Sequence, residues 1–482
     1  MKLLLFFIFS AGILFMQEID ENALFGTAET ITVYTNQKTN VLIEAIKEAV
    51  SFSGSVRTKA GYGMDRHWAE GKKSRSDLTN NELDLSIEGN LLFDIRLAKG
   101  IKSFANLGVW YYPLGRNDQH LFTTLTVQGT NLVTNTLQYF ETNIMYISFR
   151  EFFIDANIAR AVYLRLGKQV LKWGKGYFWN PSDLVNTDRK DFLDQSDYLN
   201  GNYGLKVHVP VKTVFNFYAW SGADNVRNLD ELSIAGKAEW VMGRTEVSVS
   251  AWAKKHFLPV YGFDFSTRIL GADVWGELGI SYGANDYRMR SEQQYYIKTN
   301  FVETNAIVIA GTNAVIVSGF VIETNSSVKT NYSLFHIRNR WIPRASIGLT
   351  KTFRVGGIKD RLSFTGELFY NDGGYRHNVF KDQATRDYII SRGQYSPGRL
   401  SQWYAAGFMY FSKLGVQDLD SSLNYIINLT DKSSMASWSL LYKPVFNFDL
   451  TMTLAAFTGH LNTEYTTGGN LLSAEIIARL LF

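Results

Sequence analysis

The sequence predicts an all-β protein: a transmembrane up-and-down antiparallel β-barrel of about 18 strands, with about 16 as the alternative count. Three observations predict this fold. Apolar and polar side chains alternate with a period of two from Ser51 to the end of the chain, short and long connections between the strands alternate, and the chain ends on an apolar strand closed by Phe482.

The alternation is clearest in "ELDLSIEGNLLFDIRL", residues 82–97. One face would carry Leu83, Leu85, Ile87, Leu91, Phe93, Ile95 and Leu97, and the other Asp84, Ser86, Glu88, Asn90, Asp94 and Arg96. A helix would scatter these side chains around its circumference, whereas a strand separates them completely. Residues 231–240, 245–254 and 361–370 repeat the pattern, so we expect strands with one apolar and one charged face.

A membrane barrel explains why so many strands have this character. The apolar faces would need covering layers, and the sequence contains almost no helix to supply them. If lipid covers the apolar faces and water fills the interior, both faces are satisfied, and closure pairs every backbone hydrogen-bonding group. Aromatic residues gather near the expected strand ends, where a membrane interface would lie.

The connections predict the direction of the barrel. Short ones are expected at 99–100, 157–161, 209–212, 242–244, 356–360 and 443–445, and long extracellular ones at 63–81, 114–143, 175–200, 288–336 and 372–401. The count is about 18 strands if Trp275 to Leu278 is a turn and about 16 if it is not, and an even number places both chain ends in the periplasm. We interpret the recurring Thr-Asn dipeptides of the long segments as polar loop filler.

The two ends of the chain indicate export and insertion. Met1-Lys2 followed by "LLLFFIFSAGILFM" has the layout of a secretory signal peptide, assigned to residues 1–28 without a clear cleavage site, and an N-terminal membrane anchor remains the alternative. Residues 29–50 are expected to form a periplasmic segment with a short helix, or a pore plug, ahead of a barrel at 51–482. The last strand, "SAEIIARLLF", resembles the C-terminal signal that the barrel assembly machinery recognises, which makes that machinery an expected partner.

Composition argues against other functions. The chain of 482 residues has a net charge of only +4 and no strongly basic block, so no nucleic-acid partner is expected. It has no cysteine, its 7 histidines are isolated, and neither Gly-x-Ser-x-Gly nor His-Glu-x-x-His is present. We therefore predict no enzyme activity, catalytic residue, cofactor or metal. Five aspartates at 183, 188, 191, 194 and 197 could hold calcium, but the lysines and arginine among them favour a solvated loop of mixed charge.

Residues 164–186, "LRLGKQVLKWGKGYFWNPSDLVN", begin as a strand and continue into a loop rich in Gly and aromatic residues. With the preceding segment, they resemble the Gly-Lys/Arg-Gln…Trp-Gly…Asn-Pro-x-Asp-x-x-Asn pattern of alginate-export-type porins and related uncharacterised Gram-negative outer-membrane barrels. The resemblance implies a monomeric barrel that passes solutes and a loop that folds inward to narrow the pore. The constriction set it implies is Gln169, Trp173, Gly174, Asn180, Pro181, Asp183 and Asn186. These residues could equally serve only to fix the conformation of the loop, and the chain lacks the dense Arg and Lys lumen of a polyuronate exporter.

The polar faces of the expected strands supply the candidate pore lining. Its members are Asp84, Glu88, Asp94, Arg96, Glu151, Asp155, Arg165, Lys237, Glu239, Glu246, Arg344, Arg361 and Glu367. The mixture of signs predicts weak cation preference or none, and many of these charges could pair across the wall.

The predicted function is that of a porin in the cell outer membrane, contacting its lipid and passing small hydrophilic solutes by diffusion, with a constriction near 173–200. A surface adhesin or structural barrel with a closed lumen is the main alternative, followed by an outer-membrane hydrolase.

Overall fold

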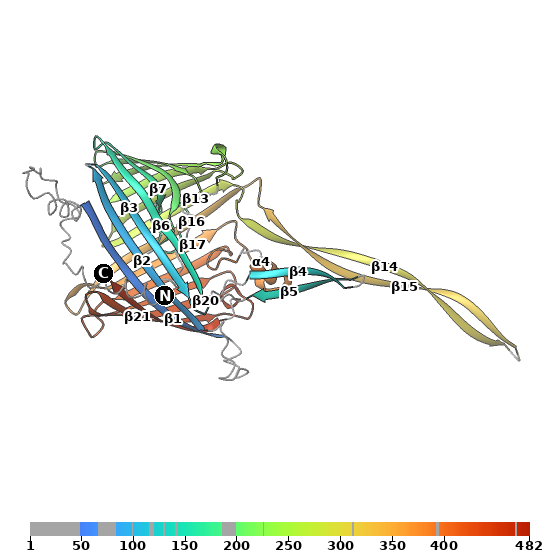
Figure 1. Ribbon diagram of the computed structural model, residues 1–482. Helices are drawn as coiled ribbons and strands as arrows, with labels where there is room; N and C mark the ends of the chain where they lie inside the picture. The colour runs from blue at the N-terminus through green and yellow to red at the C-terminus, as the bar shows by residue number, and fades with distance from the viewer. Residues whose placement is uncertain are drawn as a thin grey trace, which may run out of the picture.

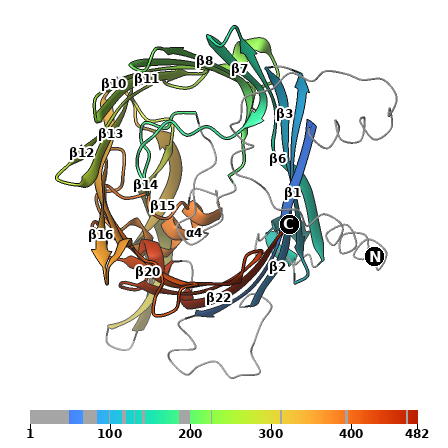
Figure 2. The same ribbon diagram turned by 90° about the vertical axis from the view of Figure 1, so that its left-hand side faces the viewer.

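A closed ring of strands forms the body of the protein (Figures 1 and 2). The computed structural model describes residues 49–65, 83–98, 100–114, 120–128, 131–139, 143–185, 199–224, 226–310, 313–391, 395–467 and 470–482. Eighteen strands belong to one sheet. The sheet closes because β1 (Val50–Asp65) pairs with both β2 (Leu83–Ala98) and β22 (Asn470–Leu481), so the prediction of a closed barrel with 18 strands is confirmed.

All neighbours in the ring are antiparallel and follow the order of the chain. After β1 and β2 come β3 (Ile101–Tyr112), β6 (Ile144–Ile158), β7 (Val162–Gln169), β8 (Asn202–Val211), β9 (Phe215–Gly222), β10 (Ser233–Met242), β11 (Thr245–Ala253), β12 (Val260–Ile269), β13 (Ala272–Tyr282), β16 (Trp341–Val355), β17 (Ile358–Asn371), β18 (Trp403–Phe411), β19 (Leu419–Asn428), β20 (Ser434–Val445), β21 (Phe448–Thr458) and β22. The even number puts the first and last strand ends at the same end of the barrel, where the connections are short.

The condition attached to the count of 18 strands is wrong, because the sheet has 18 strands without a turn at Trp275 to Leu278. Trp275 to Leu278 lie inside β13, and the turn that precedes this strand is Leu270-Gly271, with φ of 52° and 74°. Positive φ at both central residues belongs to the tight hairpin turns that match the twist of paired strands. A Cβ added to Gly276, within the span considered as a turn, would lie 2.5 Å from the ring of Phe265. This glycine therefore makes room for a neighbouring aromatic ring within a continuous strand.

Two of the long connections contain regular hairpins rather than the expected polar filler. β14 (Tyr287–Ala310) pairs with β15 (Asn313–His336) from end to end, and β4 (His120–Gln128) pairs with β5 (Asn131–Tyr139). Thr, Val and Ile are frequent in these sequences and favour extended backbone. The other long connections carry α4 (Gln383–Ser391) and the short helices η4 (Val379–Lys381) and η5 (Glu464–Thr466). No helix in the described part of the chain is long and apolar enough to cross a membrane.

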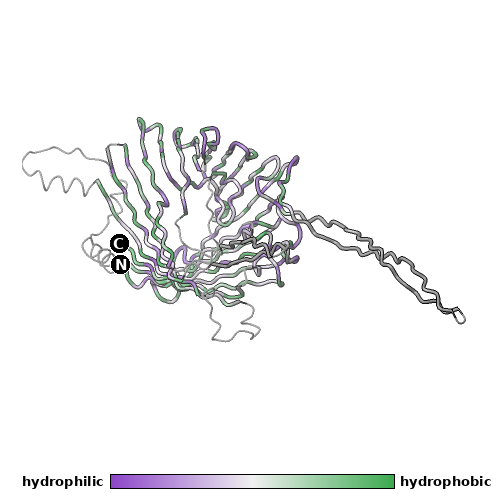
Figure 3. Tube along the Cα trace, turned by 45° about the vertical axis from the view of Figure 1, so that its right-hand side comes forward, coloured by the Kyte–Doolittle hydropathy of each residue, from purple (hydrophilic) through white to green (hydrophobic). Residues whose placement is uncertain are grey.

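Exposure is inverted relative to a water-soluble sheet protein. On β11, Val249 is 57% exposed, whereas its neighbours Ser248 and Ser250 are 1% and 8% exposed. The same alternation of apolar and polar residues continues along the other barrel strands (Figure 3). Lipid on the outside and polar groups on the inside account for this pattern. The chain is an integral barrel of the outer-membrane type.

Candidate functional site: the inward loop

The connection between β7 and β8 turns into the barrel as soon as β7 ends. Its described part, residues 170–185, is called the inward loop here; it runs inside the ring of strands (Figure 2). Gln169 is fully buried at the entrance, and its Nε2 donates to the carbonyl oxygen of Gly204 at 3.3 Å. The next amide, of Val170, donates to the Glu151 carboxylate at 2.9 Å. Wall side chains therefore direct the chain inward from its first residue.

Glu277 on β13 is the first anchor of the inward loop. Its carboxylate accepts hydrogen bonds from the backbone N–H groups of Lys175, Gly176 and Ser182, and from the Ser182 hydroxyl at 2.8 Å. Glu277 is only 3% exposed, so these contacts replace water around a buried carboxylate. The loop thus completes the solvation of a wall residue that would otherwise be costly to bury.

Glu367 on β17 is the second anchor. Its carboxylate accepts hydrogen bonds from three consecutive amides, those of Tyr177, Phe178 and Trp179, each at 2.9 Å. Consecutive N–H groups that converge in this way form a small anion-binding concavity. Hydrogen bonds to a charged acceptor are roughly twice as strong as neutral ones. The backbone of the loop is therefore fixed at this point by charge-assisted bonds.

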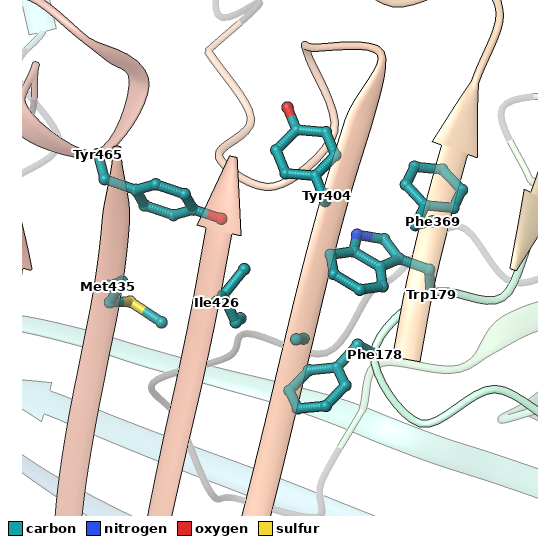
Figure 4. Packing of buried hydrophobic residues seen from close by; sticks show 8 residues of the cluster. Phe178, Trp179, Phe369, Tyr404, Ile426, Met435 and Tyr465 are labelled. Atoms are coloured by element: carbon teal, nitrogen blue, oxygen red, sulfur yellow. The ribbon is translucent and has the colours of Figure 1, made fainter. Parts of the chain in front are cut away.

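Apolar packing holds the same segment against the wall. The Trp179 indole stacks on the Phe369 ring with centroids 5.3 Å apart and planes 7° apart, and its Nε1 donates to the Gly398 carbonyl oxygen at 2.8 Å. Both rings belong to a buried cluster (Figure 4), whose members are Phe178, Trp179, Phe369, Tyr404, Ala406, Ile426, Met435 and Tyr465. Each large apolar side chain buried in this way contributes about 1.5–3 kcal/mol.

The anchors lie far around the ring from the point where the loop begins. From β7, the path through β8, β9, β10, β11, β12, β13 and β16 to β17 takes eight steps of the 18 around the barrel. Half of the circumference would be nine steps. Between these points the inward loop contacts β10, β11, β13 and β16, so it follows the inner wall and takes up part of the lumen.

A third buried carboxylate links the β17–β18 connection and the β21–β22 connection to the inward loop. Glu464 in η5 is fully buried and accepts hydrogen bonds from the Gly398 amide at 2.7 Å and from the Tyr404 hydroxyl at 2.7 Å. Asn428 also donates to this carboxylate, and Tyr395 donates to the Glu464 backbone carbonyl at 2.7 Å. Gly398 accepts a hydrogen bond from the Trp179 indole and donates one to the Glu464 carboxylate. The β17–β18 and β21–β22 connections are therefore both attached to the inward loop.

Six of the seven predicted constriction residues lie on the inward loop or at its entrance, and Asn186 lies outside the described residues. Trp173 is 5% exposed, and Asp183 closes a turn by donating its amide to the Asn180 carbonyl oxygen at 3.1 Å. Pro181 lies against the wall, because a Cβ added to Gly279 would be 2.2 Å from its carbonyl oxygen.

Sequence reasoning missed Glu277 and Ser182. Residues 275–278 were left open as a turn or a strand, although Trp275, Glu277, Gly279 and Ser281 alternate on one face of β13. That alternation was the available signal. No signal in the sequence pairs Ser182 with a strand that is 95 positions away.

Most of the predicted lumen charges are paired along the wall. Glu88 contacts Arg150 and Arg57, Asp84 contacts Lys59, Asp155 contacts Arg165, Lys237 contacts Asp264 and Glu239, Glu246 contacts Lys175, and Arg344 contacts Asp286. Glu151 and Glu367 hold amides of the inward loop, Arg361 donates to carbonyls near the short turns, and Asp94 and Arg96 lie on β2. Among the described residues, no group of three or more His, Cys, Asp or Glu could hold a metal ion. Of the five loop aspartates, only Asp183 lies within the described part of the chain.

Comparisons with known proteins find similar barrels but no sequence family. No family model matches the chain, and no curated protein matches it. Solved structures of Pseudomonas aeruginosa OccK1 (OpdK) and OccK8 (OprE) are 9% and 10% identical, each aligned over 90% of this chain and 98% of the other, with TM-scores of 0.49 and 0.47. Acinetobacter baumannii OccAB3 is 8% identical over 90% and 99%, with a TM-score of 0.47. These values record a similar fold and nothing finer, so the resemblance to alginate-export-type porins stays a prediction.

Proposed function

We propose that the chain is a channel of the Gram-negative outer membrane, through which small hydrophilic solutes diffuse passively along a lumen of mixed charge. The observation that carries the proposal is the inward loop, which two wall carboxylates hold inside a closed barrel. A loop fixed in this position would set the size of the solutes that pass.

The width of the barrel supports this function. Barrels of 16 to 18 strands enclose an aqueous channel. The inward loop takes up part of that space, and charged pairs along the wall keep the remaining lumen polar. Such a lumen favours small hydrated solutes and excludes bulky or apolar ones.

The chain ends support insertion as a closed barrel. The amide of Phe482 donates to the Gly54 carbonyl oxygen at 2.9 Å, and the Gly54 amide donates back to Phe482. The final residue thus takes part in the seam between the first and last strands. We propose that the barrel assembly machinery recognises this last strand, and that the barrel then works as a monomer.

A surface adhesin is the second candidate. It is favoured by the β14–β15 hairpin, which pairs Tyr287 with His336 and Ala310 with Asn313 across two strands of 24 residues each. A hairpin of this length exceeds what a tight barrel connection requires. It would offer extended backbone to a partner outside the cell.

Single-channel recording in planar bilayers tests the proposal. The purified full-length chain should give stable open conductance, and replacing residues 291–332 by a short Gly-Ser linker, which keeps the buried Arg288, should leave that conductance unchanged. A barrel that inserts but stays silent would argue against the channel. Cell binding that disappears with the hairpin would then establish the adhesin.

A further inference from the structure

The β14–β15 hairpin leads away from the barrel (Figure 1) and pairs along two strands of 24 residues each. At a rise of about 3.4 Å per residue, a strand of this length spans about 80 Å. The two strands form a sheet of their own, and within the described part of the chain neither pairs with a third strand. Each strand therefore has one edge whose backbone N–H and C=O groups face no other described strand.

The outer end of this hairpin, residues 304–322, is called the tip here and differs in composition from the rest. It contains neither a charged residue nor a proline, and Glu303 and Glu323 flank it. Natural edge strands usually carry charges or proline, which prevent pairing with another chain. Apolar residues occupy consecutive positions at 306–310 and 314–317, so they lie on both faces of the ribbon. The tip therefore lacks the features that keep a free edge from pairing.

The base of the hairpin is fixed to the barrel. The Arg288 side chain is 6% exposed, donates to the Leu400 carbonyl oxygen at 3.1 Å and lies over the Tyr375 ring, 4.6 Å from its centroid. The Met289 amide donates to the Tyr375 hydroxyl at 3.0 Å. These contacts hold the first residues of β14 against the β17–β18 connection. The tip is thus carried at the end of a paired ribbon whose base is attached to the barrel.

The sequence of the tip indicates which partner fits its edge. Residues 306–310 of β14 read Ala-Ile-Val-Ile-Ala, which is the same in both directions. In an antiparallel pair of two copies centred on Val308, that residue lies opposite its own counterpart. On either side of it isoleucine lies opposite isoleucine, and alanine opposite alanine. Such a pair has a two-fold axis, so the edge of one copy is complementary to the same edge of a second copy.

A second copy also meets two requirements that a lipid surface does not. A hairpin of two strands is only marginally stable by itself, whereas three or more strands give a sheet independent stability. Hydrocarbon offers no hydrogen-bonding groups, so each unpaired N–H or C=O group of the edge would be costly there. Pairing of two β14 edges joins two tips into one ribbon of four strands and satisfies the backbone groups along those edges.

We propose that the tip of the β14–β15 hairpin is a homotypic adhesion site, at which residues 306–310 of β14 pair antiparallel with the same residues of a second copy of this chain. Antiparallel pairing of these strands places the two barrels at opposite ends of the joined ribbon, so the two copies belong to facing membranes. The inference gives the adhesin candidate a partner, and it holds whether or not the barrel conducts.

Clustering of vesicles that carry the full-length protein tests this pairing. Two populations, one labelled with a donor dye and one with an acceptor dye, are mixed, and energy transfer reports their contact. We expect clustering, because many weak contacts between two membranes act together. Val308→Lys in both populations should slow clustering about tenfold, since like charges then lie directly opposite each other. Asn300→Lys, on the same face of the same strand but outside the tip, is the matched control and should change nothing.

Exchanging the sign of the charge separates pairing from damage to the hairpin. Val308→Glu in both populations should also slow clustering. Vesicles with Val308→Lys should nevertheless cluster with vesicles with Val308→Glu at close to the parental rate, because opposite charges then face each other. This rescue requires that position 308 of one copy meets position 308 of another. Protease added outside the vesicles shows that each preparation has the same number of outward-facing hairpins.

Three outcomes overturn the inference. Clustering of protein-bearing vesicles with protein-free ones would make lipid the partner. Parental vesicles with outward-facing hairpins that stay dispersed would exclude a homotypic site, and mixed variant populations that stay dispersed would exclude pairing centred on Val308. The chain with residues 291–332 replaced by a Gly-Ser linker should conduct without clustering. A silent barrel that still clusters would contradict the proposed channel while leaving the adhesion site intact.

Discussion

Replacing Glu367 with Gln should release the inward loop while leaving the barrel closed. The carboxylate accepts the amides of Tyr177 and Phe178 through Oε2 and the amide of Trp179 through Oε1. Glutamine has the same shape, but it offers one acceptor oxygen and places an NH₂ group against the remaining N–H. The change therefore acts on the attachment of the loop and makes no demand on strand pairing.

The size of the effect follows from the three bonds. A hydrogen bond to a charged group contributes about 1.5–3 kcal/mol and a neutral one about 0.5–1.5 kcal/mol. Losing one charged bond and weakening two others removes about 4 kcal/mol from the attachment of the loop. Since each 1.4 kcal/mol is a factor of ten, the released population should rise by about three orders of magnitude.

Single-channel recording combined with limited proteolysis measures this change. The variant should show a higher mean conductance, switching between levels, and faster cleavage within residues 170–185. Glu475→Gln is the matched control, because Glu475 is also a wall carboxylate but pairs with Lys59 at 2.9 Å, on strands that do not touch the inward loop. Glu277→Gln should behave like Glu367→Gln.

The reasoning fails if the Glu367→Gln channel keeps the parental conductance and the parental cleavage rate. It also fails if the control and the variant change equally, because a general loss of lumen charge would then explain both. A lower thermal stability of the whole barrel with an intact loop would place Glu367 in the wall alone.

Three further changes test the surroundings of the loop. Gly279→Ala should displace the loop and raise conductance in bilayers, since the new Cβ would lie 2.2 Å from the Pro181 carbonyl oxygen. Trp179→Ala removes the stacking on Phe369 and should cost the loop about 3–5 kcal/mol, seen as faster proteolysis with an unchanged barrel. Burial raises the pKa of Glu464 from 4.5 to about 7, so its contribution to stability is complete below pH 4.5 and is lost as the pH rises through 7. Proteases should therefore cleave the β17–β18 and β21–β22 connections more slowly at pH 5 than at pH 8, and Glu464→Gln should abolish that difference.

The barrel could be predicted from sequence because its evidence is local. The alternation of apolar and polar residues is visible within ten residues. The two faces of a strand such as β2 or β17 can therefore be assigned from its own sequence alone. The number of strands is harder to predict, because a single glycine can mark a turn or can leave room for a side chain of the neighbouring strand. Gly276 is such a case, and only the position of the Phe265 ring decides it.

The inward loop shows what sequence reasoning cannot supply. Its resemblance to a known pattern implied that it folds inward, but the anchors are contacts over long separations: Glu367 lies 190 positions from Tyr177 and Glu277 lies 101 from Gly176. Their donors are backbone amides, which every non-proline residue carries and which leave no mark in a sequence. Side-chain identity alone could not have paired them.

These anchors also change how charge in the lumen must be counted. The sequence suggested a modest excess of acids and hence a weak preference for cations, if any. The structure shows that Glu277 and Glu367 are surrounded by loop amides and that Glu246 and Asp264 are paired with lysines, so four acids are largely withdrawn from the solute. The field that a passing solute meets depends on the wall charges that the loop and the ion pairs leave uncompensated. Release of the loop would expose the carboxylates of Glu277 and Glu367 to the solute, so size selection and charge selection should change together.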